Sequence, residues 1–250
     1  MTFGSGEYTY TADMDWAQRP EGWVWGWTPG MACDSQGRIF VSSRCEHPLV
    51  LFDAAGKFLA SWGEGLLDPG AAHGIYIDAD DNVYCTEFHR HCIRKFNPAG
   101  ELVMTIGTPG VSGAEDGDPF DTPTDLAVAS TGELFISDGY GNARVHKYAP
   151  NGERLLSWGE RGSGPGQLNL SHCVRIDRQD RVWVCDRENK RIQIFDTDGN
   201  YLTEWTGLLD PNQVCFDPHE DIVYITELSQ QISIYTFDHE LITKWGAGVE

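Results

Sequence analysis

The stretch HCVRIDRQDRVWVCDRENKRIQIFDTDGNYLTEWT, residues 172–206, decides the fold. It contains four short runs rich in Val, Ile, Phe, Tyr and Trp, the residue types typical of β-strands. Short polar segments separate the runs, and Asp-Thr-Asp-Gly at 196–199 is a tight-turn sequence. The pattern predicts four consecutive strands joined by turns, which is the unit of a β-propeller blade.

This unit occurs five times along the chain, with matched positions 44, 51, 48 and 41 residues apart. One twisted four-stranded sheet cannot cover both of its faces, so repeats of this size stack face to face around an axis. We therefore predict an all-β chain folded as a single β-propeller domain spanning residues 1–250. The matched positions in the second run of each unit are Ile39, Val83, Leu134, Val182 and Val223.

The number of blades is open at this stage. Residues 8–16 alternate like a lone outer strand, as in propellers whose ring closes with strands from both termini. Either five blades close and this strand is an extra edge strand, or the chain is a six-bladed propeller whose last blade is incomplete. We favour the second interpretation. An incomplete blade exposes an apolar face and a strand edge, which predicts a homodimer formed through that edge.

Three further features follow from the repeat. A Trp ends the last run of four units and is predicted to fill the space between blades. Five cysteines lie inside apolar runs and are predicted to be small buried side chains rather than disulfide partners. The Gly- and Asp-rich residues 109–120 are predicted to form a surface loop between the second and third blades. The residues concerned are Trp62, Trp158, Trp205 and Trp245, and Cys33, Cys85, Cys173, Cys185 and Cys215.

The charge balance excludes several classes of function. With 18 Lys and Arg against 38 Asp and Glu, the formal net charge is −20. This balance argues against nucleic acid and against anionic membranes as partners, because both are bound through basic surfaces. No apolar run is long enough to span a bilayer, and the first residues lack the pattern of a signal peptide. We expect a cytoplasmic protein.

Two histidines occupy the same register position in alternate repeats. His73 precedes the first run of the second unit and His172 precedes that of the fourth, 99 residues later. In a six-bladed ring, a third His on the sixth blade would complete a threefold set around the axis. Three converging imidazoles are the ligand set of a catalytic zinc. The alternative is that each His caps its strand and bonds a backbone carbonyl group.

The turn after the second run carries a different kind of signal. Arg44, Tyr140 and Arg187 lie in this turn in different units and vary between them, so the repeat itself does not require them. An Arg near a metal suits a substrate that carries a carboxylate, and a Tyr hydroxyl suits a base or proton relay. Four of the five turns open with a carboxylate that we expect to accept turn N–H groups, namely Glu87, Asp138, Asp186 and Glu227.

Four motifs carry a resemblance to a known family. They are SSRCEH at 42–47, AHG at 72–74, SDGYGNAR at 137–144 and CDRENKRIQIF at 185–195. With these motifs the chain resembles NHL-repeat propellers, and within them the peptidyl-α-hydroxyglycine α-amidating lyases and their bacterial relatives. Those enzymes cleave a carbinolamide into an amide and glyoxylate.

The resemblance implies a set of residue roles. It implies that His73 and His172 bind zinc, that Tyr140 takes the proton of the substrate hydroxyl, and that Arg44 holds the substrate carboxylate or the surroundings of the tyrosine. Arg187 is grouped with Tyr140 and Arg44 as a catalytic residue. It further implies a structural calcium bound by backbone oxygens near Met31 and Ile75, together with an Asp of the last blade. The implied substrate is a small molecule or peptide that carries a carboxylate.

The chain also departs from the family pattern. The third His and the calcium-binding Asp would belong to sixth-blade strands that the sequence does not contain, and Pro is replaced by Ala72 and Ser171 before the two histidines. Two other functions stay open. One is a non-catalytic propeller scaffold, which the negative charge would steer toward a basic partner. The other is a calcium-dependent lactonase, with the four turn carboxylates and Asn212 as ligands.

Overall fold

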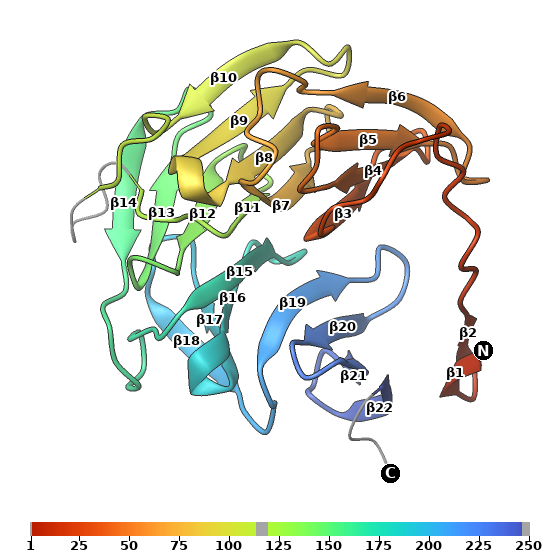
Figure 1. Cartoon of the computed structure of the whole chain (residues 1–250). Helices are drawn as coiled ribbons and strands as arrows, with labels where there is room; N and C mark the ends of the chain where they lie inside the picture. Colours follow the sequence, from red (N-terminus) through yellow and green to blue (C-terminus); the bar gives the residue numbers. More distant parts are fainter. Residues whose placement is uncertain (1, 114–119, 247–250) are drawn as a thin grey trace.

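Five four-stranded antiparallel sheets surround a common axis in the computed structural model, which describes residues 2–113 and 120–246 (Figure 1). This arrangement confirms the predicted all-β propeller. The blades are β3–β6 (Gly30–Cys33, Ile39–Ser42, Leu49–Phe52, Phe58–Trp62), β7–β10 (Ala72–Ile77, Val83–Glu87, Cys92–Phe96, Leu102–Ile106), β11–β14 (Asp125–Val128, Leu134–Asp138, Arg144–Tyr148, Arg154–Trp158), β15–β18 (Ser171–Ile176, Val182–Asp186, Arg191–Phe195, Tyr201–Trp205) and β19–β22 (Pro211–Phe216, Ile222–Glu227, Gln231–Thr236, Leu241–Gly246).

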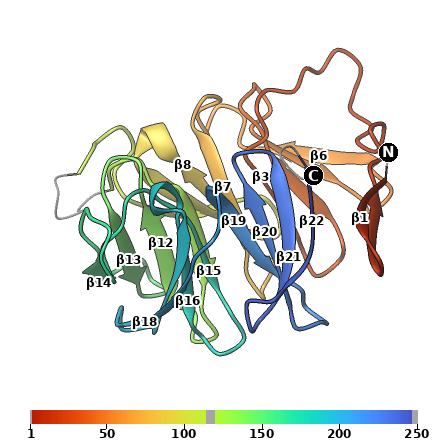
Figure 2. The same cartoon turned by 90° about the horizontal axis from the view of Figure 1, so that it is seen from below.

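The first strand of each blade contacts the first strand of the next, from β3 to β7, β11, β15 and β19, whereas the first strands of the last and first blades, β19 and β3, are not in close contact. Figure 2 shows β15 and β19 running side by side. Two single-turn helices, η1 (Phe88–Arg90) and η2 (Arg187–Asn189), follow the second strands of the second and fourth blades. Residues at the start of each inner strand and in the turn after each second strand therefore meet at one mouth of the channel.

Tryptophans fill the spaces between blades at three of the four predicted positions. Each of these three packs on an aromatic ring of its own blade and on one of the next blade. The centroid distances are Trp62 to Phe40 5.3 Å and to Phe96 6.5 Å, Trp158 to Phe135 6.1 Å and to Phe195 5.8 Å, and Trp205 to Trp183 4.8 Å and to Tyr235 5.8 Å. Trp245 differs because the last blade has the N-terminal segment as its neighbour, and it stacks on Tyr10 at 5.4 Å.

The N-terminal segment departs from the prediction. Only Tyr8–Thr11 of the predicted strand 8–16 is a strand, β2, and it pairs with β1 (Thr2–Ser5) as a separate hairpin. The predicted strand is therefore shorter than expected and belongs to a two-stranded sheet. The hairpin packs on the last blade, where the hydroxyls of Tyr10 and Tyr224 lie 3.0 Å apart. That this sheet is part of an incomplete sixth blade stays a prediction.

The residues after the hairpin cross to the first blade and cover its free face. Trp16 and Trp25 pack on Phe52 with centroid distances of 5.5 and 6.0 Å, and Trp23 packs on Phe58 at 5.1 Å. Residues 2–29 thus connect the last blade to the first (Figure 1).

Two of the five predicted buried cysteines are exposed. Cys85, Cys173 and Cys185 are buried as expected, whereas Cys33 and Cys215 are exposed, and all are free thiols. Cys33 and Cys215 lie on the innermost strands of the first and last blades. Side chains alternate along a strand, and Ala32 packs toward the second blade, so Cys33 points to the opposite side. The error arises because a repeat pattern treats terminal blades like internal ones.

The insertion at 109–120 falls partly outside the described residues, which omit 114–119. Its last residue, Phe120, is fully buried and packs on His146 at 5.5 Å and Tyr148 at 5.7 Å. The end of this segment is thus part of the core rather than a surface loop. Among the described residues, no helix has the length and apolar content needed to cross a membrane.

The packing of the residues after the hairpin on the first blade leads to a stability prediction. We expect Trp16→Ala to lower the free energy of unfolding by about 2 kcal/mol, less than the ~3–5 kcal/mol of a fully buried aromatic side chain, because Trp16 is half-buried. Trp27→Ala is the matched control, since Trp27 lies in the same segment with 78% of its surface exposed. Urea unfolding measures both, and equal effects of the two substitutions would contradict the packing described.

Candidate functional site

A bulge in the innermost strand orients each of the two histidines. In β15, Ser171 pairs with Asp186 and Cys173 with Cys185, so His172 is an extra residue without a partner in the ladder. The ladder between β7 and β8 is irregular in the same way between Ala72 and Ile75, a stretch that contains His73. Bulges redirect side chains at sites of this kind. Both imidazoles consequently aim at the channel mouth.

The two imidazoles converge on the hydroxyl of Tyr140. The Nε2 atoms of His73 and His172 lie 3.2 and 3.0 Å from Tyr140 Oη, and the two imidazole centroids are 5.1 Å apart. The Nδ1 atom of His73 bonds the carbonyl oxygen of Thr124 at 2.7 Å, and that of His172 bonds the carbonyl oxygen of Asn212 at 2.8 Å. The sequence left two alternatives, that each His bonds a backbone carbonyl group or that the two imidazoles converge. In the structure each His does both.

These bonds determine the tautomer of both rings. A carbonyl oxygen only accepts hydrogen bonds, so each Nδ1 carries the hydrogen and each neutral Nε2 presents a lone pair. Tyr140 has one hydroxyl hydrogen and can donate it to only one of the two Nε2 atoms. The lone pair of the other Nε2 then faces a lone pair of Tyr140 Oη at hydrogen-bonding distance, with no hydrogen between them. A cation bound by both Nε2 atoms would satisfy them, so the pair supplies two of the ligands that a zinc ion takes in proteins.

Burial keeps the two rings neutral. His73 and His172 are 7% and 8% exposed. Burial lowers the pKa of His73 from 6.5 to about 4, with further lowering by the charges of Arg44 and Arg187. Burial also lowers the pKa of His172, to about 3, and neighbouring His73 and Arg187 add to the effect. Metal ligands must be unprotonated, and this site holds both imidazoles in that form throughout the neutral pH range.

Close backbone contacts hold Tyr140 in place. A Cβ atom on Gly139 would overlap the backbone of Ser171, and one on Gly141 would overlap Asp121. The turn therefore lies directly against the strand that carries His172 before Tyr140, and against the loop at Asp121 after it. Tyr140 is 38% exposed, so its ring lies between the buried imidazoles and the channel mouth.

Two arginines border the site. Arg44 Nε donates to the carbonyl oxygen of Ala72 at 2.9 Å, and its guanidinium lies over the ring of Phe88 at 4.4 Å. Arg187 Nη1 donates to Asn212 Oδ1 at 3.4 Å, and its guanidinium lies 5.9 Å from the ring centre of Tyr140. A chain with a net charge of −20 thus presents two positive groups beside the histidines. This arrangement suits a ligand that carries a carboxylate.

The four turn carboxylates have structural partners, but the N–H groups that they accept come from another loop and not from their own turn, and Glu87 and Asp186 pair with an Arg of their own blade rather than of a neighbouring one. Each is buried and accepts a backbone N–H group from the loop that leads into the inner strand of its own blade. The bonds are Asp68 N to Glu87 at 2.7 Å, Asp121 N to Asp138 at 3.0 Å, Asn169 N to Asp186 at 2.6 Å and Leu209 N to Glu227 at 2.5 Å. These side chains shape the loops around the mouth.

The predicted calcium residues lie on neighbouring innermost strands. Met31 is in β3 and Ile75 in β7, and Gly30 packs directly against Ile75. Whether their backbone oxygens bind calcium stays a prediction. Within residues 2–113 and 120–246, no group of three or more His, Cys, Asp or Glu side chains has the arrangement to hold a metal ion.

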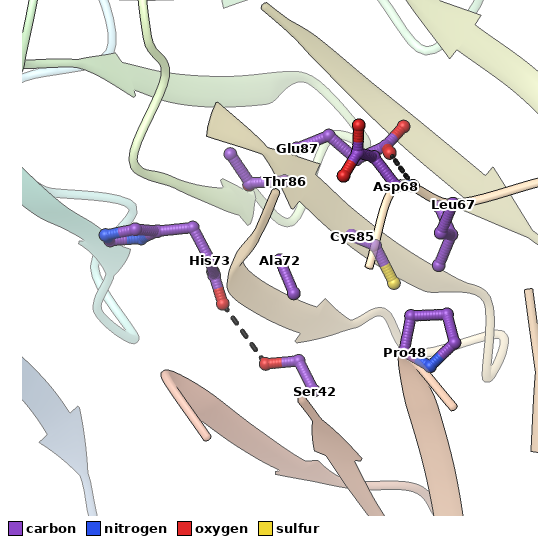
Figure 3. A pocket seen from close by; sticks show the side chains of 10 residues that line it. Ser42, Pro48, Leu67, Asp68, Ala72, His73, Cys85, Thr86 and Glu87 are labelled. Carbon is purple, nitrogen blue, oxygen red and sulfur yellow. Dashed lines mark hydrogen bonds between the residues drawn. The ribbon is translucent and has the colours of Figure 1, made fainter. Parts of the chain in front are cut away.

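A small cavity lies behind His73, between the first two blades. It has a volume of about 10 Å³, room for one water molecule, and its lining includes Ala72, Cys85 and Glu87. Figure 3 shows the imidazole of His73 directed away from it, while the carbonyl oxygen of His73 accepts a bond of 3.2 Å from Ser42 Oγ. The imidazole of His73 therefore faces the channel mouth and not this cavity.

The sequence did not reveal the residues that orient the imidazoles. Thr124 and Asn212 act through their backbone carbonyl oxygens, a group that every residue carries. A positional signal did exist, since both occupy the same register position in their blades as His73 and His172. Phe88, which lies 5.4 Å from His73 and 6.0 Å from Tyr140 between ring centroids, also escaped notice.

The chain matches known repeat proteins over most of its length. The family model described as NHL repeat matches residues 120–148 and 169–195. Human NHL repeat-containing protein 3 is 34% identical over 237 residues, which cover 88% of this chain and 67% of that protein.

Two further similarities concern proteins named as lyases. Peptidyl-alpha-hydroxyglycine alpha-amidating lyase 1 of Drosophila melanogaster is 31% identical over 174 residues, or 64% of this chain and 31% of the fly protein. A solved structure of a streptogramin B lyase superposes with a TM-score of 0.69 at 12% identity, covering 91% of this chain and 71% of that one. At that identity the superposition shows the propeller fold alone.

The neutral, buried imidazoles generate a pH prediction for the metal-free protein. In the unfolded chain both rings bind protons below about pH 6.5, while in the folded chain they stay neutral down to about 4 and 3. The folded pKa values are lowered, so the stability of the fold decreases as the pH falls. The pair should contribute a slope of roughly 2 kcal/mol per pH unit between pH 6 and 4.5, with two protons per unfolded chain as the upper limit.

Urea unfolding in the presence of a chelator measures this slope. We expect His172→Gln to remove about half of it, whereas His219→Gln, at an exposed position, leaves it unchanged. The same slope in His172→Gln and in the unaltered protein would show that His172 is protonated normally in the folded chain.

Proposed function

The chain belongs to the NHL-repeat protein family, and we propose that it is a metal-dependent lyase of the peptidyl-α-hydroxyglycine amidating type. One observation carries this proposal: the unprotonated Nε2 atoms of His73 and His172 meet at the hydroxyl of Tyr140. The similarity to the fly lyase supports the same reaction class.

The proposed reaction converts a carbinolamide, whose central carbon carries a hydroxyl, an amide nitrogen and a carboxylate, into an amide and glyoxylate. The C–N bond breaks, the hydroxyl oxygen becomes the aldehyde oxygen, and the hydroxyl proton ends on the amide nitrogen. His73 and His172 would hold zinc, which when bound supplies a Lewis acid that polarises the substrate hydroxyl.

The remaining residues of the site bind the substrate and move its proton. Tyr140 Oη lies next to both imidazoles, where it would relay the proton by accepting that of the hydroxyl and donating its own to the leaving nitrogen. The Nε atom of Arg44 is held by Ala72, which leaves its two terminal nitrogens for the substrate carboxylate. Arg187, held against Asn212 and over Tyr140, adds positive charge on the other side.

Two protein ligands give weaker binding of zinc than three. The described residues supply His73 and His172 only, so we expect water and substrate to fill the other positions on the metal.

A second candidate function is a non-catalytic scaffold. The net charge of −20 favours it, because such a surface attracts a basic partner. A calcium-dependent lactonase has less support, since Glu87, Asp138, Asp186 and Glu227 already accept backbone hydrogen bonds.

Zinc titration by calorimetry and a glyoxylate-release assay test the proposal. We expect the protein to bind one zinc ion and to form glyoxylate from a peptide carbinolamide. His73→Gln and His172→Gln should each weaken zinc binding by about 100-fold or more, since each removes a ligand. Tyr140→Phe should retain zinc binding and slow glyoxylate release by about 10²–10⁴-fold.

His219→Gln is the control, because it removes an exposed imidazole that lies outside the site. Zinc binding that survives both substitutions at His73 and His172 would refute the metal site. Intact zinc binding without any glyoxylate release would leave a metal-binding propeller with a different reaction.

A further inference from the structure

We propose that Thr124 and Asp125, which begin the inner strand of the third blade, are positioning residues that hold His73 and His172 at their mutual spacing. The third blade lies between the two blades that carry the histidines. This inference rests on the proposed function, because it assigns a role toward the same metal site.

The carbonyl group of Thr124 holds the second blade. Its oxygen accepts hydrogen bonds from His73 Nδ1 at 2.7 Å and from the backbone N–H of Gly74 at 3.1 Å. A Cβ atom on Gly74 would lie 2.8 Å from this same oxygen and from Asp125 Cα, closer than atoms can approach. The glycine therefore permits β7 to lie directly against the start of β11, with the imidazole and the backbone bonded to one oxygen.

The hydroxyl group of Thr124 holds the fourth blade. Thr124 Oγ1 donates to the carbonyl oxygen of Ser171 at 2.8 Å and lies 2.7 Å from Ser137 Oγ, a partner that can donate to it. Ser171 directly precedes His172 in the bulge of β15. Thr124, Ser137 and Ser171 are all fully buried, so no water replaces these bonds without entering the core.

Asp125, the residue after Thr124, joins the third blade to the fourth through its carboxylate. Its Oδ2 atom pairs with Arg175 Nη1 at 2.5 Å, and this nitrogen also lies 2.7 Å from the carbonyl oxygen of Val174. Asp125 is buried, and Arg175 lies three residues after His172. Removing one partner of such a buried pair leaves the other charge unpaired in the core, so displacement of the two strands relative to each other is costly.

Together these contacts of Thr124 and Asp125 connect the second, third and fourth blades at one place, which we call the joint. One dipeptide bonds the imidazole of His73 through its backbone, the residue before His172 through a hydroxyl, and the strand beyond His172 through a carboxylate. None of its atoms reaches Tyr140 Oη by any hydrogen bond among the described residues, so its effect on a metal would act through the two ligands. Residues that orient ligands in this manner typically change metal affinity by about 10–100-fold when removed.

The test compares two substitutions of Thr124 by zinc titration of the full chain. Thr124→Val removes the hydroxyl and keeps the shape, and should weaken zinc binding by about 10–100-fold. Thr124→Ser keeps the hydroxyl and should bind zinc within about threefold of the unaltered protein. Thr131→Val, at an exposed position of the same blade, is the matched control. Equal zinc affinity of Thr124→Val and the unaltered protein would overturn the proposal.

A metal-free readout separates this inference from the proposed function. Nitrogen-15 NMR of the imidazoles reports the tautomer of each ring, and we expect one tautomer, with hydrogen on Nδ1, in the unaltered protein and in Thr124→Ser. Thr124→Val retains the two backbone carbonyl oxygens that bond Nδ1, so it should keep this tautomer but shift or broaden the imidazole resonances of His73 and His172 as their spacing changes. An unaltered protein that fails to bind zinc refutes the lyase, while unchanged imidazole spectra in Thr124→Val refute the joint.

Asp125→Asn provides the second variant should Thr124→Val fail to fold. It keeps the shape of the side chain and one acceptor oxygen but removes the charge opposite Arg175. We expect the same direction of change in zinc affinity and imidazole spectra. Unchanged values of both in a folded Asp125→Asn protein would likewise overturn the proposal.

Discussion

The hydrogen bond from each imidazole Nδ1 to a backbone carbonyl group is the interaction on which the site depends. His73 bonds Thr124 and His172 bonds Asn212, and in both cases the carbonyl group belongs to the inner strand of the following blade. Each bond therefore spans two blades and responds to how the blades stack. It fixes the tautomer, and the tautomer decides whether Nε2 presents a lone pair or a hydrogen to the channel. Everything proposed about metal binding follows from that choice.

The propeller supplies what a short peptide could not. Inner strands from successive blades lie side by side, and a bulge in β15 redirects one side chain toward the shared mouth. Burial in this packed ring keeps both imidazoles neutral by lowering each pKa. The two arginines at the mouth lie in the turns after the second strands, where the sequence varies between repeats. Orientation thus comes from the conserved geometry of the blades, and local charge comes from turns that differ between them.

The repeat made the fold predictable, because strand runs and turn sequences recur with a nearly constant spacing. The same register identified His73 and His172, and variation between repeats identified Tyr140, which the structure brings together with them. Predictions from the repeat were wrong at the two ends of the chain, where a blade does not have the same neighbours as an internal one. Cys33 and Cys215 are exposed because terminal blades lack one neighbour, and the N-terminal hairpin forms its own sheet. Every residue carries a backbone carbonyl group, so residue type does not reveal the partners of Nδ1, although Thr124 and Asn212 share the register position of the two histidines.

The most direct measurement of the central claim is anomalous diffraction at the zinc absorption edge from crystals grown with zinc. The account predicts one strong anomalous peak about 2.1 Å from the Nε2 atoms of both His73 and His172, the usual distance from zinc to an imidazole nitrogen. A peak bound to only one of these rings, or zinc found only at exposed side chains, would contradict it.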